Sequence, residues 1–154
     1  MFKKAHSYVE HEKKGIYMVK KFELIKNDHI NLYDTKLYRI RALIDFDNIS
    51  AGDLGGYIEK EENLAQEGNA WVYDKAFVFD DARVCNNAQI RDSAWVYGNA
   101  VIYDNATVHG NVVIYGNTRV YGNARVYGNA VIYDNTTVYG PRIVTGKQIG
   151  RAHV

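Results

Sequence analysis

The sequence of 154 residues has few cysteines, no long apolar run and almost no net charge. Its single cysteine, Cys85, cannot form an internal disulfide, which favours a reducing compartment. No apolar run is long enough to span a bilayer, and the N-terminus lacks the apolar core of a signal peptide. The formal net charge of +1 gives no general case for nucleic acid or an anionic membrane surface. These absences predict a soluble cytoplasmic protein that binds neither nucleic acid nor membrane.

Proline is also nearly absent, with one residue, whereas tyrosine occurs 13 times. Both counts follow from a six-residue repeat that runs without insertion from Gly68 to Tyr139. Its second position is mostly Asn, its third mostly Ala, its fifth always Val or Ile, and its sixth mostly aromatic. Self-similarity this strict is typical of a solenoid. The twelve hexads are GNAWVY, DKAFVF, DDARVC, NNAQIR, DSAWVY, GNAVIY, DNATVH, GNVVIY, GNTRVY, GNARVY, GNAVIY and DNTTVY.

Alternation within each hexad predicts which side chains lie inside. The third and fifth positions are two residues apart, so on a strand they face the same side, and their small and β-branched residues suit a narrow interior. The fourth position faces outward. Gly, Asn and Asp at the first two positions tolerate the left-handed backbone region that a corner needs. Three strands and three corners close a triangular coil of 18 residues, so the hexads predict four coils.

These hexads resemble the repeat of left-handed parallel β-helix proteins, best known from acyltransferases. That repeat usually has Gly, Ala or an acid after the aliphatic residue, where this chain mostly has Tyr. With its YGNARVYGNA run, the chain is more similar to a YGNA-repeat family of bacteria and phages, and the resemblance covers about residues 20–139. It implies an all-β, left-handed parallel β-helix from a phage or mobile element. An intracellular phage protein of this size suggests an anti-defence role.

Four segments are expected along the chain. Residues 18–67 hold a β-hairpin, with the strand-like runs KKFELIK and KLYRIRALIDF, and a turn at Asp53, Gly55 and Gly56; this segment would cap the end of the β-helix. The β-helix itself would span residues 68–145. Residues 1–17 are predicted to be translated leader, because codons for Lys14 to Met18 can spell a ribosome-binding site before an ATG. Residues 146–154 are predicted to be a tail from metagenomic assembly, because QIGRAHV is encoded by a common sequencing adapter.

Hexads three apart stack on one face, which sorts the outward fourth positions into three columns. The second column is wholly apolar and lies beside an aromatic column of sixth positions. A surface this apolar predicts an interface, and left-handed β-helices that resemble this one commonly form trimers through one face. We therefore expect a homotrimer; the alternative is that the hairpin folds back over this face. The first column is Trp71, Gln89, Thr107 and Arg125, the second is Phe77, Trp95, Val113 and Val131, the third is Arg83, Val101, Arg119 and Thr137, and the aromatic column is Phe79, Tyr97, Tyr115 and Tyr133.

Arginine and tyrosine residues are the candidates for ligand binding. Arginine suits phosphate or carboxylate, and a tyrosine ring beside it could stack on a nucleobase. The sequence thus predicts that a nucleotide-like or other small anionic ligand, or a host protein, binds at grooves between subunits. The alternative is a solvated strand face. The candidates are Arg39 and Arg41 on one predicted strand, Arg83 and Arg119 in one column, and Tyr103 and Tyr121.

His109 is the weak candidate for catalysis, as a general base of the acyltransferase kind that the resemblance keeps open. It replaces a corner tyrosine, and no loop interrupts the hexads to complete a cleft. Cys85 has no partner histidine and is predicted to be a corner substitution. One histidine within the coils cannot build a metal site of the several-histidine kind, and no cofactor is expected. The column Asn69, Asn87, Asn105 and Asn123 is predicted to bond to neighbouring backbone.

The most consistent interpretation is a non-catalytic binding protein. Two alternatives stay open: an acyltransferase-like enzyme that uses His109, and a purely structural module of a larger assembly. The uninterrupted hexads favour binding over catalysis, because deep loops usually complete the cleft of enzymes that resemble this fold.

Overall fold

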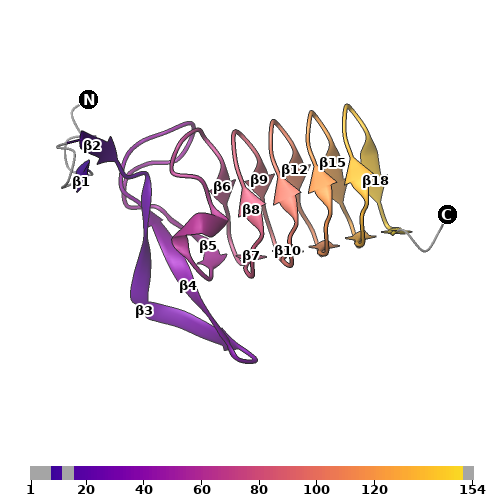
Figure 1. Cartoon of the computed structure of the whole chain (residues 1–154), viewed down its shortest axis with the longest axis horizontal. Coiled ribbons are helices and arrows are strands. Elements are labelled where there is room, and N and C mark those ends of the chain that lie inside the picture. Colours follow the sequence, from indigo (N-terminus) through magenta and orange to yellow (C-terminus); the bar gives the residue numbers. More distant parts are fainter. Residues whose placement is uncertain (1–7, 12–15, 151–154) are drawn as a thin grey trace.

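The computed structural model of the chain describes residues 8–11 and 16–150. They form an all-β parallel solenoid of about five turns with almost no helix, apart from a short 3₁₀ turn, η2 (Glu61–Asn63). The hairpin of β3 (Phe22–Leu32) and β4 (Thr35–Ala42) projects from the N-terminal end of the stack of coils (Figure 1). A separate two-stranded antiparallel sheet consists of β1 (Tyr8–His11) and β2 (Ile16–Val19).

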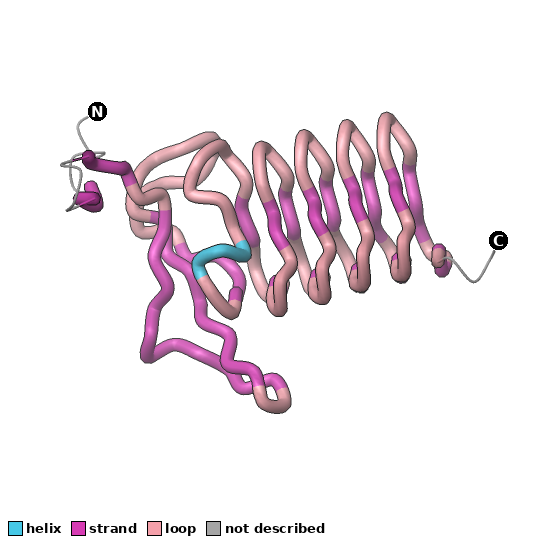
Figure 2. Tube along the Cα trace, in the orientation of Figure 1, coloured by secondary structure: helices cyan, strands magenta, loops and turns pink. Residues whose placement is uncertain are grey.

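Three sheets form three faces, on which the strands of successive coils pair in parallel. The strand segments of the hexads are short and separated by corners (Figure 2). Trp95, for example, lies in register with Phe77 and Val113, one coil before and one after. Face 1 contains β6 (Trp71–Val72), β9 (Gln89–Ile90), β12 (Thr107–Val108), β15 (Arg125–Tyr127) and β18 (Ile143–Thr145). Face 2 contains β5 (Leu54–Ile58), β7 (Phe77–Val78), β10 (Trp95–Val96), β13 (Val113–Ile114), β16 (Val131–Ile132) and β19 (Gln148–Ile149). Face 3 contains β8 (Arg83–Val84), β11 (Val101–Ile102), β14 (Arg119–Val120) and β17 (Thr137–Val138).

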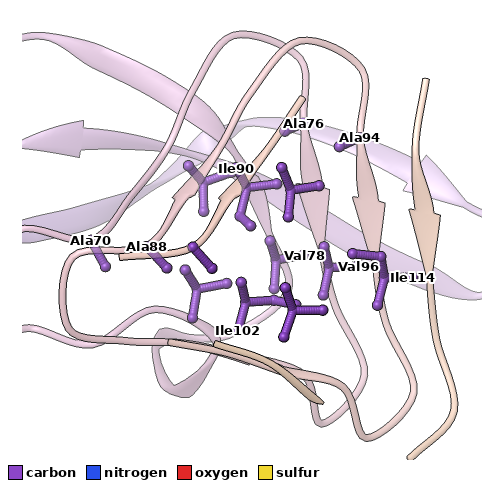
Figure 3. Close-up of a cluster of buried hydrophobic side chains, with 14 of the residues drawn as sticks. Ala70, Ala76, Val78, Ala88, Ile90, Ala94, Val96, Ile102 and Ile114 are labelled. Atoms are coloured by element: carbon purple, nitrogen blue, oxygen red, sulfur yellow. The ribbon is translucent and has the colours of Figure 1, made fainter. Parts of the chain in front are cut away.

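The interior is filled by alanine, valine and isoleucine side chains, as the hexads predict (Figure 3). Every fifth-position residue from Val72 to Val138 is fully buried, and so is every third-position residue except Thr136. Thr118 fits inside because its Oγ1 donates to the carbonyl oxygen of Tyr115 at 2.7 Å. The prediction of which side of each strand faces inward is confirmed.

The first position of each hexad turns the corner with a positive φ. Asp92 and Asp104 both have a φ of 58°, a conformation that Asp and Asn tolerate better than most residues. Their carboxylates also accept backbone N–H groups of the equivalent corner in the next coil, as Asp92 Oδ2 does from Gly110 N at 2.8 Å. Two second-position Asn residues of the predicted column bond differently from the prediction. Asn87 Nδ2 donates to the side-chain Oδ1 of Asn105 at 3.2 Å, so these two residues bond to each other along the column rather than to backbone.

Parallel pairing extends beyond the hexads at both ends. Before them, Tyr57 lies in register with Phe77. After them, β18 and β19 join faces 1 and 2, so the solenoid exceeds the four predicted coils. Within the predicted tail, Gln148 and Ile149 form β19, while residues 151–154 lie outside the described residues. The leader stays a prediction, and its residues 1–7 and 12–15 also lie outside the described residues.

Gly55 and Gly56 lie within β5 and do not form the predicted turn. A Cβ at Gly55 would lie 2.5 Å from the carbonyl oxygen of Val72, and a Cβ at Gly56 would lie 2.6 Å from that of Ala76. Because glycine has no side chain, the two residues let β5 approach the first hexads closely enough to pair.

The segment before β5 closes over the N-terminal end of face 1. Trp71, predicted to point outward, is only 1% exposed. Phe22 and Phe46 meet its ring edge-on, with ring centroids 6.4 and 5.3 Å away. The sequence predicts that the second hairpin strand runs as far as Phe46. The strand β4 instead ends at Ala42, so Phe46 is not part of it. Local alternation could not anticipate this burial, because it comes from residues far earlier in the chain.

Lys21 is buried beside these rings, with 1% of its surface exposed. Its Nζ donates to the carbonyl oxygens of Gly68 at 3.1 Å and Ala70 at 2.8 Å, and lies 5.0 Å from the centre of the Phe46 ring. Burial lowers the pKa of Lys21 from 10.5 to about 8, because it penalises the charged form.

We expect the unfolding free energy of the natural chain, relative to Lys21→Met, to rise between about pH 8 and 10.5. In this range the unfolded chain keeps the proton on Lys21 and the folded chain has lost it, so a higher pH favours folding. The slope should stay below about 1.4 kcal/mol per pH unit. Urea unfolding of both chains across this range measures it, and a difference that is constant with pH would contradict the lowered pKa.

Val96→Asp should prevent folding, because an unpaired carboxylate in the dry interior costs more than about 4 kcal/mol. Val101→Asp is the matched control. Val101 points outward between Arg83 and Arg119, so this variant should fold. Circular dichroism and thermal melting distinguish the two results. A folded Val96→Asp chain would show that Val96 does not line the interior.

Candidate interaction surface

Face 2 presents two neighbouring columns of apolar and aromatic side chains. The fourth- and sixth-position residues are two apart, with the fully buried fifth-position residue between them, so both lie on the outward side. The fourth-position column is in register along the solenoid, and all of its members are partly exposed. We call these two columns the aromatic surface: Phe77, Trp95, Val113 and Val131, with Phe79, Tyr97, Tyr115 and Tyr133.

The rings of the aromatic surface stack on one another along the solenoid. Phe79 and Tyr97 lie nearly parallel with centroids 4.8 Å apart, and Tyr97 and Tyr115 with centroids 5.1 Å apart. Phe77 stacks on Trp95 at 5.2 Å, and Phe79 meets Trp95 edge-on. Such contacts stabilise aromatic pairs beyond the area they bury. They hold the surface in one arrangement without a partner, and they already bury Phe79.

The aromatic surface continues onto the N-terminal strands. Tyr57 of β5 meets Phe77 edge-on at 5.8 Å, and the guanidinium of Arg39 on β4 lies 4.6 Å from the centre of the Tyr57 ring. Strands β4 and β3 continue the sheet of face 2 beyond β5, at its N-terminal edge (Figure 1). The alternative prediction, that the hairpin folds back over this face, is therefore wrong.

The structure does not gather the six residues predicted to bind a ligand. Arg39 donates through Nη1 to the carbonyl oxygen of Gly55 at 3.0 Å and through Nη2 to the Tyr57 hydroxyl at 2.7 Å. Arg41 pairs with Glu23 across the hairpin. Both guanidinium groups are thus engaged within the N-terminal strands, in a different sheet from the other candidates.

Face 3 brings together the other four candidates. Arg83 and Arg119 flank Val101, while Tyr103 and Tyr121 belong to the sixth-position column of the same face. Tyr121 stacks between Tyr103, at 4.9 Å, and Tyr139, at 5.6 Å. Both sides of the Tyr121 ring are therefore covered, and a nucleobase could stack on it only by displacing a neighbour.

His109 lies on face 1 with a third of its side chain exposed. Its ring stacks on Tyr127 at 5.0 Å, and its Nδ1 is 3.8 Å from Asp92 Oδ2. Cys85 is a free, half-buried thiol, and burial raises its pKa, which disfavours the reactive thiolate. Within residues 8–11 and 16–150, no three His, Cys, Asp or Glu side chains gather as a metal site requires. No helix in these ranges is long and apolar enough to cross a bilayer.

Sequence reasoning missed three side chains at the N-terminal end of the solenoid. Lys21 and Asn63 are buried there, and Gln66 accepts a backbone N–H from each of Lys21 and Phe22. A hollow of about 610 Å³ lies beside Lys21 and Gln66, with Phe46 in its wall. No local pattern marks these residues, because their burial arises from packing against the first hexads.

Comparison with known proteins bears on the hexads. Residues 94–110, 100–116 and 118–133 match the YdcK beta solenoid repeat. The hexads are similar to that repeat. A 39-residue stretch is also 51% identical to a protein of Escherichia coli strain K12 described as the uncharacterised acetyltransferase YdcK. This stretch is 25% of the chain but spans only 12% of the YdcK protein. The residues that match the repeat lie within the hexads, so this likeness concerns repeats of the solenoid. The YGNA-repeat family, the phage source and the anti-defence role stay predictions.

Proposed function

We propose that this chain is a non-catalytic solenoid that assembles with copies of itself through the aromatic surface of face 2. The observation that carries the proposal is the unbroken run of partly exposed apolar and aromatic side chains along that face. An apolar surface this regular is costly to leave in water. A host protein or a small anionic ligand would bind in grooves between the copies.

The proposal keeps the left-handed sense, the trimeric state and the capping role of the N-terminal segment. The six-residue period resembles that of left-handed β-helices, which commonly form trimers. A closed cyclic arrangement uses the same patches on every copy and leaves none of them exposed. The constant offset between paired strands from β6 to β17 favours a scaffold over an enzyme, because no loop leaves these coils to build a cleft.

Trp95 lies near the middle of the aromatic surface, where the residues that dominate binding energy usually lie. Burying an aromatic side chain removes on the order of 150 to 250 Å² from water, and apolar burial contributes about 25 cal/mol per Å². Phe77 and Phe79 already cover part of Trp95, so association would bury only the remainder. The stacked rings beside it add area at little entropic cost, because they are ordered before association.

Trp95→Glu should convert the assembly to monomers, because charges would meet on one desolvated surface. Val101→Glu, which places the same charge outward on face 3, should leave the assembly intact. Light scattering with size-exclusion chromatography gives the mass of each chain. A natural chain that stays monomeric at high micromolar concentration would refute assembly through face 2.

A second candidate function is acetyl transfer with His109 as general base. It is favoured by the position of His109 within the matched repeat and by the name of the YdcK relative. Under our proposal, the chain should release no coenzyme A from acetyl-coenzyme A above background, with or without amine acceptors. Thiol release in a colorimetric assay measures this. Turnover that His109→Ala abolishes and His29→Ala preserves would favour the enzyme instead.

A further inference from the structure

Backbone hydrogen bonds between coils follow one rule through most of the hexads. N–H groups at the second, fourth and sixth positions donate to carbonyl oxygens at the first, third and fifth positions of the following coil. Arg83 N donates to Ala100 O at 2.9 Å, for example, and Cys85 N to Ile102 O at 3.0 Å. The carbonyl groups of the first hexads point toward the N-terminal end, where no complete hexad coil precedes them.

In the first three hexads, which form the first coil, seven of these carbonyl groups nevertheless accept hydrogen bonds. Three accept ordinary backbone N–H groups from the preceding segment. Ala76 O accepts from Tyr57 N, Val78 O from Glu59 N, and Val84 O from Ala65 N. The other four, of Gly68, Ala70, Asp80 and Ala82, accept from only two side chains, those of Lys21 and Asn63.

The two side chains bridge equivalent positions of different hexads. Lys21 Nζ reaches the first- and third-position carbonyl groups of one hexad, Gly68 and Ala70. Asn63 Nδ2 reaches the same positions two hexads later, at 3.1 Å from Asp80 O and 2.9 Å from Ala82 O. In the middle of the solenoid, these positions accept from the second- and fourth-position N–H groups of the coil before.

Both side chains are held in place by further hydrogen bonds. Asn63 is fully buried, and its Oδ1 accepts backbone N–H groups from Glu59 at 3.1 Å and Lys60 at 2.9 Å. The backbone N–H of Lys21 donates to Gln66 Oε1 at 2.6 Å. Two buried polar groups, otherwise costly, are thus paired with the carbonyl groups that most need donors.

We infer that Lys21 and Asn63 replace the backbone N–H groups of a missing coil and thereby close the N-terminal end of the solenoid against a second copy of this chain. An exposed sheet edge is a template for pairing with another chain. Here each coil presents the same pattern of acceptors, so an open end would accept the donors of another copy. The inference concerns the end of the solenoid and does not depend on assembly through face 2.

The test uses the double variant Lys21→Met with Asn63→Ala, made in both the natural chain and the Trp95→Glu background. The control is Lys20→Met with Asn123→Ala, which removes an adjacent lysine and an exposed asparagine. In sedimentation velocity, the mass of the double variant should rise with concentration and at least double relative to its own background. The control should match its background. If the mass also rises in the Trp95→Glu background, the association occurs through the N-terminal end of the solenoid and not through face 2.

A second measurement uses the chain without any substitution, and a third uses a variant that keeps donors at residue 21. In protein labelled with ¹⁵N-lysine, the Lys21 ammonium should give a signal whose protons exchange slowly with water, because it is buried and bonded to two carbonyl groups. Lys21→Arg, which keeps several donors, should preserve the mass of the natural chain. A folded double variant with unchanged mass, or Lys21 protons that exchange as fast as those of Lys20, would overturn the inference.

Discussion

Hydrogen bonds between successive coils are the interaction on which the rest of this structure depends. Trp95 N donates to Val112 O at 2.9 Å, and nearly the same bond recurs at each following coil. Because the offset between paired residues is 18 through the hexads, any extra residue there must leave the coil as a loop. The interior is therefore narrow and uniform, and only small or β-branched side chains such as Ala94 and Val96 fill it without strain.

Because of the same register, equivalent outward residues of successive coils lie in a column. A residue type that recurs in the hexads therefore recurs along the whole face. On face 2 the repeated residue types are apolar and aromatic, and their rings stack along the solenoid before any partner is present. On face 3 Arg83 and Arg119 alternate with the apolar Val101. A column can present a long contact surface, but its side chains lie side by side and do not easily surround one bound atom or group. This geometry suits recognition between extended surfaces better than the chemistry of a cleft.

In the middle of the solenoid, each coil receives hydrogen bonds from the coil before it. The first coil has no such coil before it, so its carbonyl groups need other donors. The segment before Gly68 meets this need with non-repeating residues: two glycines that let β5 pair, and two buried side chains that donate where no strand does. Lys21 loses part of its preference for the charged form as a result. The same segment also covers Trp71, so the end of face 1 differs from the rest of that face.

By itself, the sequence determined the repeating part of this protein. The side of each strand that faces inward, the positive φ of the corners and the membership of each column follow from a two-residue alternation and an 18-residue coil, both of which are local or strictly periodic. Only the tertiary structure decided the burial of Lys21, Asn63 and Trp71, and the pairing of Arg39 with Tyr57. These contacts join segments that share no period with the hexads. Their physical cause is the unpaired backbone and apolar surface at the end of the first coil, and which residues meet those needs depends on how the chain folds back in space.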